Sequence, residues 1–127
     1  MDWEQNDYIL IIGDDERVGQ GLTDMLQDNG HRVVTFDDGR MAIEYLRQKF
    51  ILPRLILLDS ARPQTHGREF LAEQRKDARI SSIPVIGISA HETSHEPVAS
   101  SFTQMLTQPV SLDAVLGAVQ RWAPAPA

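Results

Sequence analysis

The chain has 127 residues, the length of one ordinary domain, and its 42% hydrophobic and 24% charged residues are typical of a globular protein. A net charge of −6 without a basic run argues against direct binding to nucleic acid or to an anionic membrane, and no apolar stretch reaches the roughly 20 residues that span a bilayer. Because cysteine is absent, disulfides and thiolate metal sites are excluded, and the simplest location is the cytoplasm. We expect one domain over residues 1–127, with a core from about 7 to 122 and a Pro/Ala tail over 123–127.

Apolar runs alternate with amphipathic segments along the first 50 residues. The predicted elements are, in chain order, a strand over Tyr8–Ile12, a helix with apolar side chains at Val18, Leu22, Met25 and Leu26, a strand over His31–Phe36, and a helix with apolar side chains at Met41, Ala42, Tyr45 and Leu46. Gly13 ends the first strand, and Asn29-Gly30 ends the first helix. Asp37-Asp38-Gly39 turns the chain into the second helix.

The run Leu55-Ile56-Leu57-Leu58 organises the rest of the chain. Four consecutive aliphatic residues without polar alternation predict a strand that is buried on both faces, as inner strands of a parallel sheet are. Asp59 ends this strand. Open α/β proteins bind their ligands at the carboxyl ends of the strands, so Asp59 is the candidate working residue.

The second half continues the alternation of helices and strands. After a loop over Ser60–Gly67, the predicted elements are a helix over Glu69–Lys76, a strand over Ile83–Ile88, a polar segment over His91–Ser101, a strand over Met105–Thr107, and a helix that Ser111 caps, with Leu112, Val115, Leu116, Val119 and Trp122 on one side. Five strands alternating with helices predict an α/β fold, a doubly wound five-stranded parallel sheet with helices on both faces.

In this architecture the residues that follow each strand meet at one edge of the sheet. Asp14, Asp15, Asp59, Ser89 and Gln108 would gather there. Clustered carboxylates repel one another unless a cation lies among them, and hard oxygen ligands suit Mg²⁺ better than zinc. Taken without Asp59, the pair Asp14 and Asp15 has a simpler explanation, as acids that favour the positive end of a helix dipole.

From Tyr8 to Trp122 the chain resembles the receiver domains of two-component response regulators, which are related to the chemotaxis response regulator. The matching motifs are Asp14-Asp15, Asp37-Asp38-Gly39, Leu55–Asp59 with Pro63 and Gly67 behind it, Ile83–Ile86 leading to Ser89-Ala90, and Leu106-Thr107-Gln108-Pro109. The resemblance implies a flavodoxin-like sheet with strand order 2-1-3-4-5. It also implies a signalling domain that catalyses at most its own phosphorylation and dephosphorylation.

The resemblance assigns a role to each residue at the predicted edge. Asp59 matches the aspartate that accepts a phosphoryl group from a phosphohistidine on a sensor histidine kinase or a histidine phosphotransfer protein. Asp14 and Asp15 match the Mg²⁺-binding acids, with Asp59 and the backbone carbonyl of Ala61 as the other protein ligands. Ser89 matches the hydroxyl residue that moves to bond the phosphoryl oxygen. Such a transfer needs an in-line nucleophile and positive charge on the phosphoryl oxygens.

The chain departs from the family pattern in three places: two single residues and one loop. Gln108 stands where the family has an almost invariant lysine before Pro109, and an amide can donate a hydrogen bond but cancels no charge. Met105 occupies the place of the aromatic switch residue, so the usual rotamer readout is altered or missing.

The loop after Asp59 also differs. Arg62, Thr65 and His66 replace what is commonly Met, Met and Asp. Arg62 could partly compensate for the lost lysine, but the simpler interpretation is an exposed surface arginine. His31 and His66 are interpreted as ordinary surface histidines.

Two functions follow from this pattern. In the first, Asp59 is phosphorylated with Mg²⁺ and the domain passes the signal to a downstream protein through the last helix and the fifth-strand surface. In the second, the domain is a pseudo-receiver that binds partners without phosphorylation, through the last helix and the region Ser101–Leu106. We favour the first because Asp14, Asp15, Asp59 and Ser89 are all present.

One further motif points to a different chemistry. His91-Glu92-Thr93-Ser94-His95 matches the H-E-x-x-H pattern of zinc metalloproteases. The context argues against that function, because no apolar face flanks the motif and Pro97 follows at once. We interpret the segment as a polar loop.

Overall fold

The computed structural model describes residues 8–13, 16–49, 51–59, 67–89, 102–107 and 111–122. Within these ranges the parallel strands are β1 (Tyr8–Ile12), β2 (Arg32–Phe36), β3 (Leu55–Asp59), β4 (Val85–Ser89) and β5 (Gln104–Thr107). The helices in the same ranges are α1 (Glu16–Asp28), α2 (Gly39–Gln48), α3 (Gly67–Lys76) and α4 (Leu112–Trp122). The strand order is β2-β1-β3-β4-β5. The predicted fold class and strand order are therefore confirmed.

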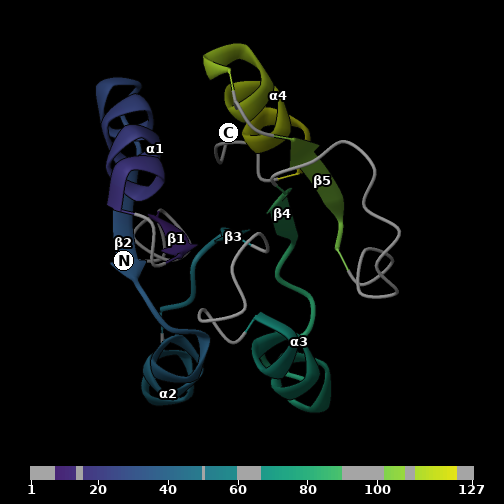
Figure 1. The fold of residues 1–127 in the computed structure, drawn as a ribbon. Helices are drawn as coiled ribbons and strands as arrows, with labels where there is room; N and C mark the ends of the chain where they lie inside the picture. Colours follow the sequence, from purple (N-terminus) through teal and green to yellow (C-terminus); the bar gives the residue numbers. More distant parts are fainter. Residues whose placement is uncertain are drawn as a thin grey trace.

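The strand β3 lies at the centre of the sheet, between β1 and β4 (Figure 1). Its five residues are all buried, and so are those of β1. The register places Ile12 of β1 beside Leu58 and Ile88 of β4 beside Asp59. The continuous aliphatic run therefore forms the inner strand that its composition predicts.

Two hydrophobic layers lie on opposite faces of the sheet, because successive side chains of a strand point to opposite faces. Leu55 and Leu57 belong to one layer, which α1 and α4 cover. Ile56 and Leu58 belong to the other, which α2 and α3 cover. Figure 1 shows the two pairs of helices on the two sides of the strands. No helix within the described ranges is long and apolar enough to cross a membrane.

The ends of the helices follow the residues that predicted them. The Asp38 carboxylate accepts a hydrogen bond from the Arg40 backbone N–H at 2.7 Å and caps α2. The Ser111 hydroxyl accepts one from the Ala114 N–H at 3.1 Å at the start of α4. Gly30, after α1, has a φ of 86°, in the left-handed region that favours glycine at helix ends.

Two side chains predicted on apolar helix faces are in fact exposed. Met41 is 58% exposed and Leu112 is 41% exposed. In α2 the buried positions are Gly39, Ala42, Ile43 and Leu46, a face with helical spacing that leaves Met41 to one side. Leu112 begins α4 one turn before its buried positions, which are Val115, Ala118 and Val119. In both helices the buried stripe is narrower than the apolar pattern.

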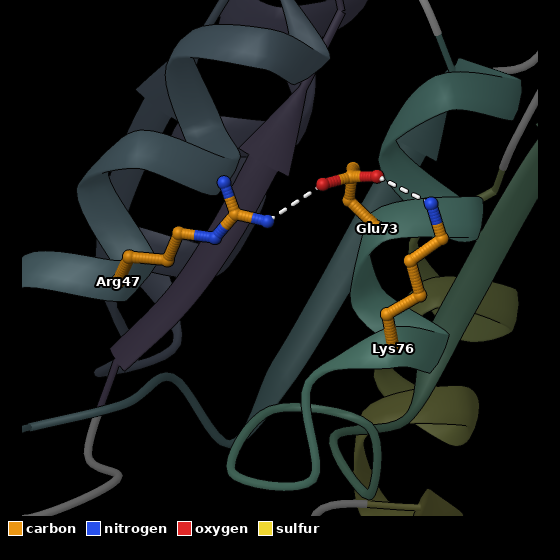
Figure 2. Close-up of polar contacts among 3 residues, drawn as sticks. All are labelled: Arg47, Glu73 and Lys76. Carbon is orange, nitrogen blue, oxygen red and sulfur yellow. Dashed lines mark hydrogen bonds and ion pairs between the residues drawn. The ribbon is translucent and has the colours of Figure 1, made fainter.

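An exposed network of ion pairs connects α2 to α3, as Figure 2 shows. The Glu73 carboxylate accepts a hydrogen bond from the Arg47 guanidinium at 2.7 Å and another from the Lys76 ammonium at 3.1 Å. The bond from Arg47, followed by that from Lys76, lowers the pKa of the Glu73 carboxyl below its usual value. Solvent screening keeps the stabilisation from these exposed ion pairs small, so the packing of α2 and α3 depends mainly on their buried side chains.

A buried amide completes the packing of α3. Gln74 is 5% exposed, and its side-chain N–H groups donate to the backbone carbonyls of Ile80 at 3.0 Å and Ile83 at 3.1 Å. These bonds satisfy carbonyls in the connection from α3 to β4, where no strand partner is available. Gln74 is therefore buried beside Phe70 and Leu71 on the inner face of α3, where the sequence offers few apolar residues.

The prediction that His31 is an ordinary surface residue is wrong. His31 is only partly exposed and lies at the amino end of the strands, where the Arg54 guanidinium is 2.6 Å from its Nδ1. Since a guanidinium only donates, Nδ1 accepts this bond and the imidazole is neutral. Burial, and secondarily the charge of Arg54, lowers the pKa of His31 below 6.5.

Truncation of β3 should be far more costly than truncation of an exposed apolar residue. Leu57→Ala should lower the free energy of unfolding by about 3 kcal/mol, because it leaves a cavity where the side chain was fully buried. Met41→Ala should change it by less than about 0.5 kcal/mol. Urea denaturation of both variants measures the difference, and similar losses would contradict the assignment of the two side chains to core and surface.

Acidification should weaken the fold through His31. Because the pKa of His31 is lowered in the folded state, the unfolded chain binds this proton more tightly. This contribution is complete above about pH 6.5 and is lost as the pH falls towards the folded-state value. His31→Gln retains an acceptor for Arg54 but does not titrate. Urea midpoints from about pH 7.5 to about pH 5 should therefore fall more steeply for the wild type than for this variant. Parallel curves would exclude the effect.

Candidate functional site

The carboxyl ends of the inner strands meet at one edge of the sheet. Asp59 ends β3 beside Ile88, and the next residue of β4, Ser89, pairs with Thr107 of β5. The Asp59 side chain is 5% exposed, one of two buried polar or charged residues among those that the structure describes. A carboxylate in such a position needs compensating hydrogen bonds or a cation to remain ionised, which is typical of a functional group.

Gly13, the residue after β1, lies in close contact with Asp59. Its N–H donates a hydrogen bond to the carbonyl of Phe36, the last residue of β2, at 2.8 Å. A Cβ on Gly13 would lie 2.9 Å from the Asp59 Cβ and 3.5 Å from its Oδ2. Because Asp14 and Asp15 follow Gly13 in the chain, the predicted acid pair begins one residue from this contact.

The predicted metal ligands fall largely outside the described ranges. Asp14, Asp15 and Ala61 lie outside them, and within them no group of three His, Cys, Asp or Glu residues is placed to hold a metal ion. Asp59 contributes a buried hard oxygen donor at the edge where the acid pair begins. These donors suit Mg²⁺, and the ligand set stays a prediction.

Beside the Ser89 strand, Gly87 leaves room for two larger side chains. A Cβ on Gly87 would collide with the Met105 sulfur and would lie 2.8 Å from two ring carbons of Phe102. Met105 is the β5 partner of Gly87 in the register. Met105, the residue predicted at the position of the family's switch aromatic, therefore packs over Gly87, which lies two residues before Ser89 in β4. Sequence reasoning did not single out Gly87 or Phe102, although a glycine inside a strand is a known sign of close approach.

The predicted partner surface, formed by α4 and β5, is connected by a side-chain hydrogen bond. The Trp122 indole N–H donates to the Gln104 side-chain oxygen at 2.6 Å. The Arg121 guanidinium lies over the Trp122 ring, 5.2 Å from its centre. The bond ties the end of α4 to the start of β5. The use of this surface for binding stays a prediction.

Several predicted residues lie outside the described ranges. They are Gln108, the loop residues Arg62, Thr65 and His66, and the H-E-x-x-H motif over His91–His95. For Ser89 the structure describes only the backbone, which ends β4 at the edge where Asp59 lies.

Comparisons with known proteins identify the same family over most of the chain. The model of the response regulator receiver domain matches residues 9–120. The protein PilH from Pseudomonas aeruginosa is 30% identical over 111 residues, which cover 85% of this chain and 90% of PilH.

Solved structures of similar proteins share the fold. The phosphorylated cyanobacterial phytochrome response regulator RcpA has a TM-score of 0.78 at 28% identity, with 96% of this chain and 97% of that one covered. The receiver domain of the sensor histidine kinase PA1611 from Pseudomonas aeruginosa has a TM-score of 0.81 at 22% identity, covering 92% and 97%. That domain coordinates a magnesium ion in its active-site cleft.

Proposed function

Because the chain belongs to the response regulator receiver domain family, we propose that Asp59 accepts a phosphoryl group from a phosphohistidine and that the domain then signals by protein contact. The observation that carries this proposal is the buried Asp59 carboxylate, at the sheet edge where Gly13 follows β1 and Ser89 ends β4. The similarity to the phosphorylated regulator RcpA supports it.

The proposed reaction uses Asp59 as an oxygen nucleophile. One carboxylate oxygen forms a bond to phosphorus while the bond from phosphorus to the histidine nitrogen breaks, and the imidazole leaves with the electron pair. The backbone pairing of β3 with its neighbours fixes the main chain at Asp59, which supports a role as a positioned nucleophile. The proposed role of the Ser89 hydroxyl is to donate a hydrogen bond to the phosphoryl group after transfer.

We assign the metal site to Asp14, Asp15, Asp59 and the backbone carbonyl of Ala61. A bound Mg²⁺ would neutralise charge on the phosphoryl oxygens. Gln108 can donate an amide hydrogen bond to the same group but supplies no charge.

The proposed partners are a phosphoryl donor and a downstream target. In this proposal the domain acts in the cytoplasm, the donor is a sensor histidine kinase or a histidine phosphotransfer protein, and the target binds the α4 and β5 surface. Residues 1–127 act as one receiver domain in this proposal, with a core from about 7 to 122. The glutamine at 108 favours a second candidate, a pseudo-receiver that binds its partners without phosphorylation.

Phosphorylation of Asp59 can be tested on the intact protein. Incubation with a small acyl phosphate and Mg²⁺ should add one phosphoryl group to the wild type, measured by intact mass, and none to Asp59→Ala. Asp113→Ala, which removes an exposed aspartate from α4, should retain the adduct. An unmodified wild type, or an equal adduct on Asp59→Ala, would reject the proposal and leave the pseudo-receiver.

Restoring a cation at position 108 should accelerate the reaction. Gln108→Lys adds a positive charge where negative charge develops on the phosphoryl group, so the phosphorylation rate should rise by about tenfold or more. Gln108→Met, of similar length and without charge, should not accelerate it. Time courses of adduct formation measure the rates. An unchanged rate in Gln108→Lys would show that the amide already satisfies this position.

A further inference from the structure

Gly13 is held between two neighbouring strands. On one side, its N–H donates to the Phe36 carbonyl of β2 at 2.8 Å. On the other, its Cα faces the Asp59 side chain of β3, so closely that a Cβ at this position would lie 2.9 Å from the Asp59 Cβ. Real Cβ atoms essentially never approach one another so closely, so any residue other than glycine would force a displacement here.

The requirement at this position is for space and not for an unusual backbone conformation. Among the described glycines, Gly30 is the one with a positive φ, and Gly13 does not share that conformation. By contrast, a Cβ added at Gly21 in α1 or at Gly117 in α4 would meet nothing within 4 Å. The constraint on Gly13 therefore comes from Asp59 itself.

The displacement cannot be absorbed by a side-chain rotation. The Asp59 Cβ is fixed by the backbone of β3, which is paired with β4 at Ile88. Gly13 could move away from Asp59 only towards β2, where its N–H is already bonded to Phe36. A methyl group at position 13 would thus shift the Asp59 carboxylate or break the bond between Gly13 and Phe36.

We propose that Gly13 is a positioning residue for Asp59, because its missing side chain is the space that the Asp59 side chain occupies at the edge of the sheet. This inference rests on the proposed function, since it gives the position of Asp59 a consequence for phosphoryl transfer. Displacement of a nucleophile by a fraction of an ångström to about 1 Å is enough to slow a reaction by one to two orders of magnitude.

The first test compares two glycine-to-alanine variants. Gly13→Ala should slow phosphorylation by an acyl phosphate and Mg²⁺ by about tenfold or more, whereas Gly21→Ala should stay within about twofold of the wild type. The ¹³C resonance of the Asp59 carboxyl, assigned by its loss in Asp59→Asn, should move in metal-free Gly13→Ala and stay in place in Gly21→Ala. A Gly13→Ala variant with the wild-type rate would overturn the inference and leave the proposed function intact.

The second test is independent of phosphorylation. Because the clash is with the Asp59 Cβ, Gly13→Ala should lower Tm by at least about 3 °C in the wild-type background and by much less in Asp59→Gly, which lacks that atom. If Gly13→Ala alone does not fold, recovery of the fold in the double variant supports the contact. Equal losses in the two backgrounds would overturn the inference.

The two tests separate the two proposals. If the wild type takes no phosphoryl group, the proposed function fails. The Tm values of Gly13→Ala in the wild-type and Asp59→Gly backgrounds still decide whether a Cβ at position 13 clashes with Asp59. If the wild type is phosphorylated and Gly13→Ala lowers Tm equally in the two backgrounds, the positioning role of Gly13 is rejected and the proposed function stands.

Discussion

The structure depends on the burial of β3 on both faces and along both edges. Its neighbours β1 and β4 satisfy its backbone groups, and the two hydrophobic layers cover its side chains. A strand enclosed in this way can present chemistry only at its end, where the chain leaves the sheet. Asp59 occupies that end and is buried like the rest of β3.

The fold could be predicted from the sequence because its strongest signals are hydrophobic patterns that extend over whole strands and helices. Four aliphatic residues before Asp59 predicted an inner parallel strand, and the alternation with amphipathic helices predicted a doubly wound parallel sheet. The strand order followed from the resemblance to receiver domains. The errors arose where tertiary contacts determine the end of a strand or the burial of a side chain. Ile83 was assigned to a strand, but β4 begins at Val85, and the Ile83 carbonyl accepts a hydrogen bond from Gln74 instead. His31 was assigned to the surface because its partner, Arg54, is 23 residues away in the chain.

The candidate site shows the same division. Parallel topology alone predicted that Asp59 and Ser89 lie at the same edge of the sheet. It could not predict what lies against them. Gly13 was interpreted only as the end of a strand, and Gly87 as an ordinary strand residue, because a glycine gives no side-chain pattern from which a neighbour can be inferred. A glycine inside a strand signals a close approach, but the sequence does not say that the neighbour is Asp59 for Gly13 and Met105 for Gly87. The residues that shape the space around a functional group are thus harder to predict than the group itself.

The two hydrophobic layers contain different residues and are separated by the thickness of the sheet. Each of them can therefore be repacked without a matching change in the other, since only strand backbones connect them. A lineage of such domains could reshape the surface over α1 and α4 to suit a new partner while the packing beneath α2 and α3 is inherited unaltered. Divergence of what the domain recognises is then compatible with preservation of the scaffold that holds Asp59.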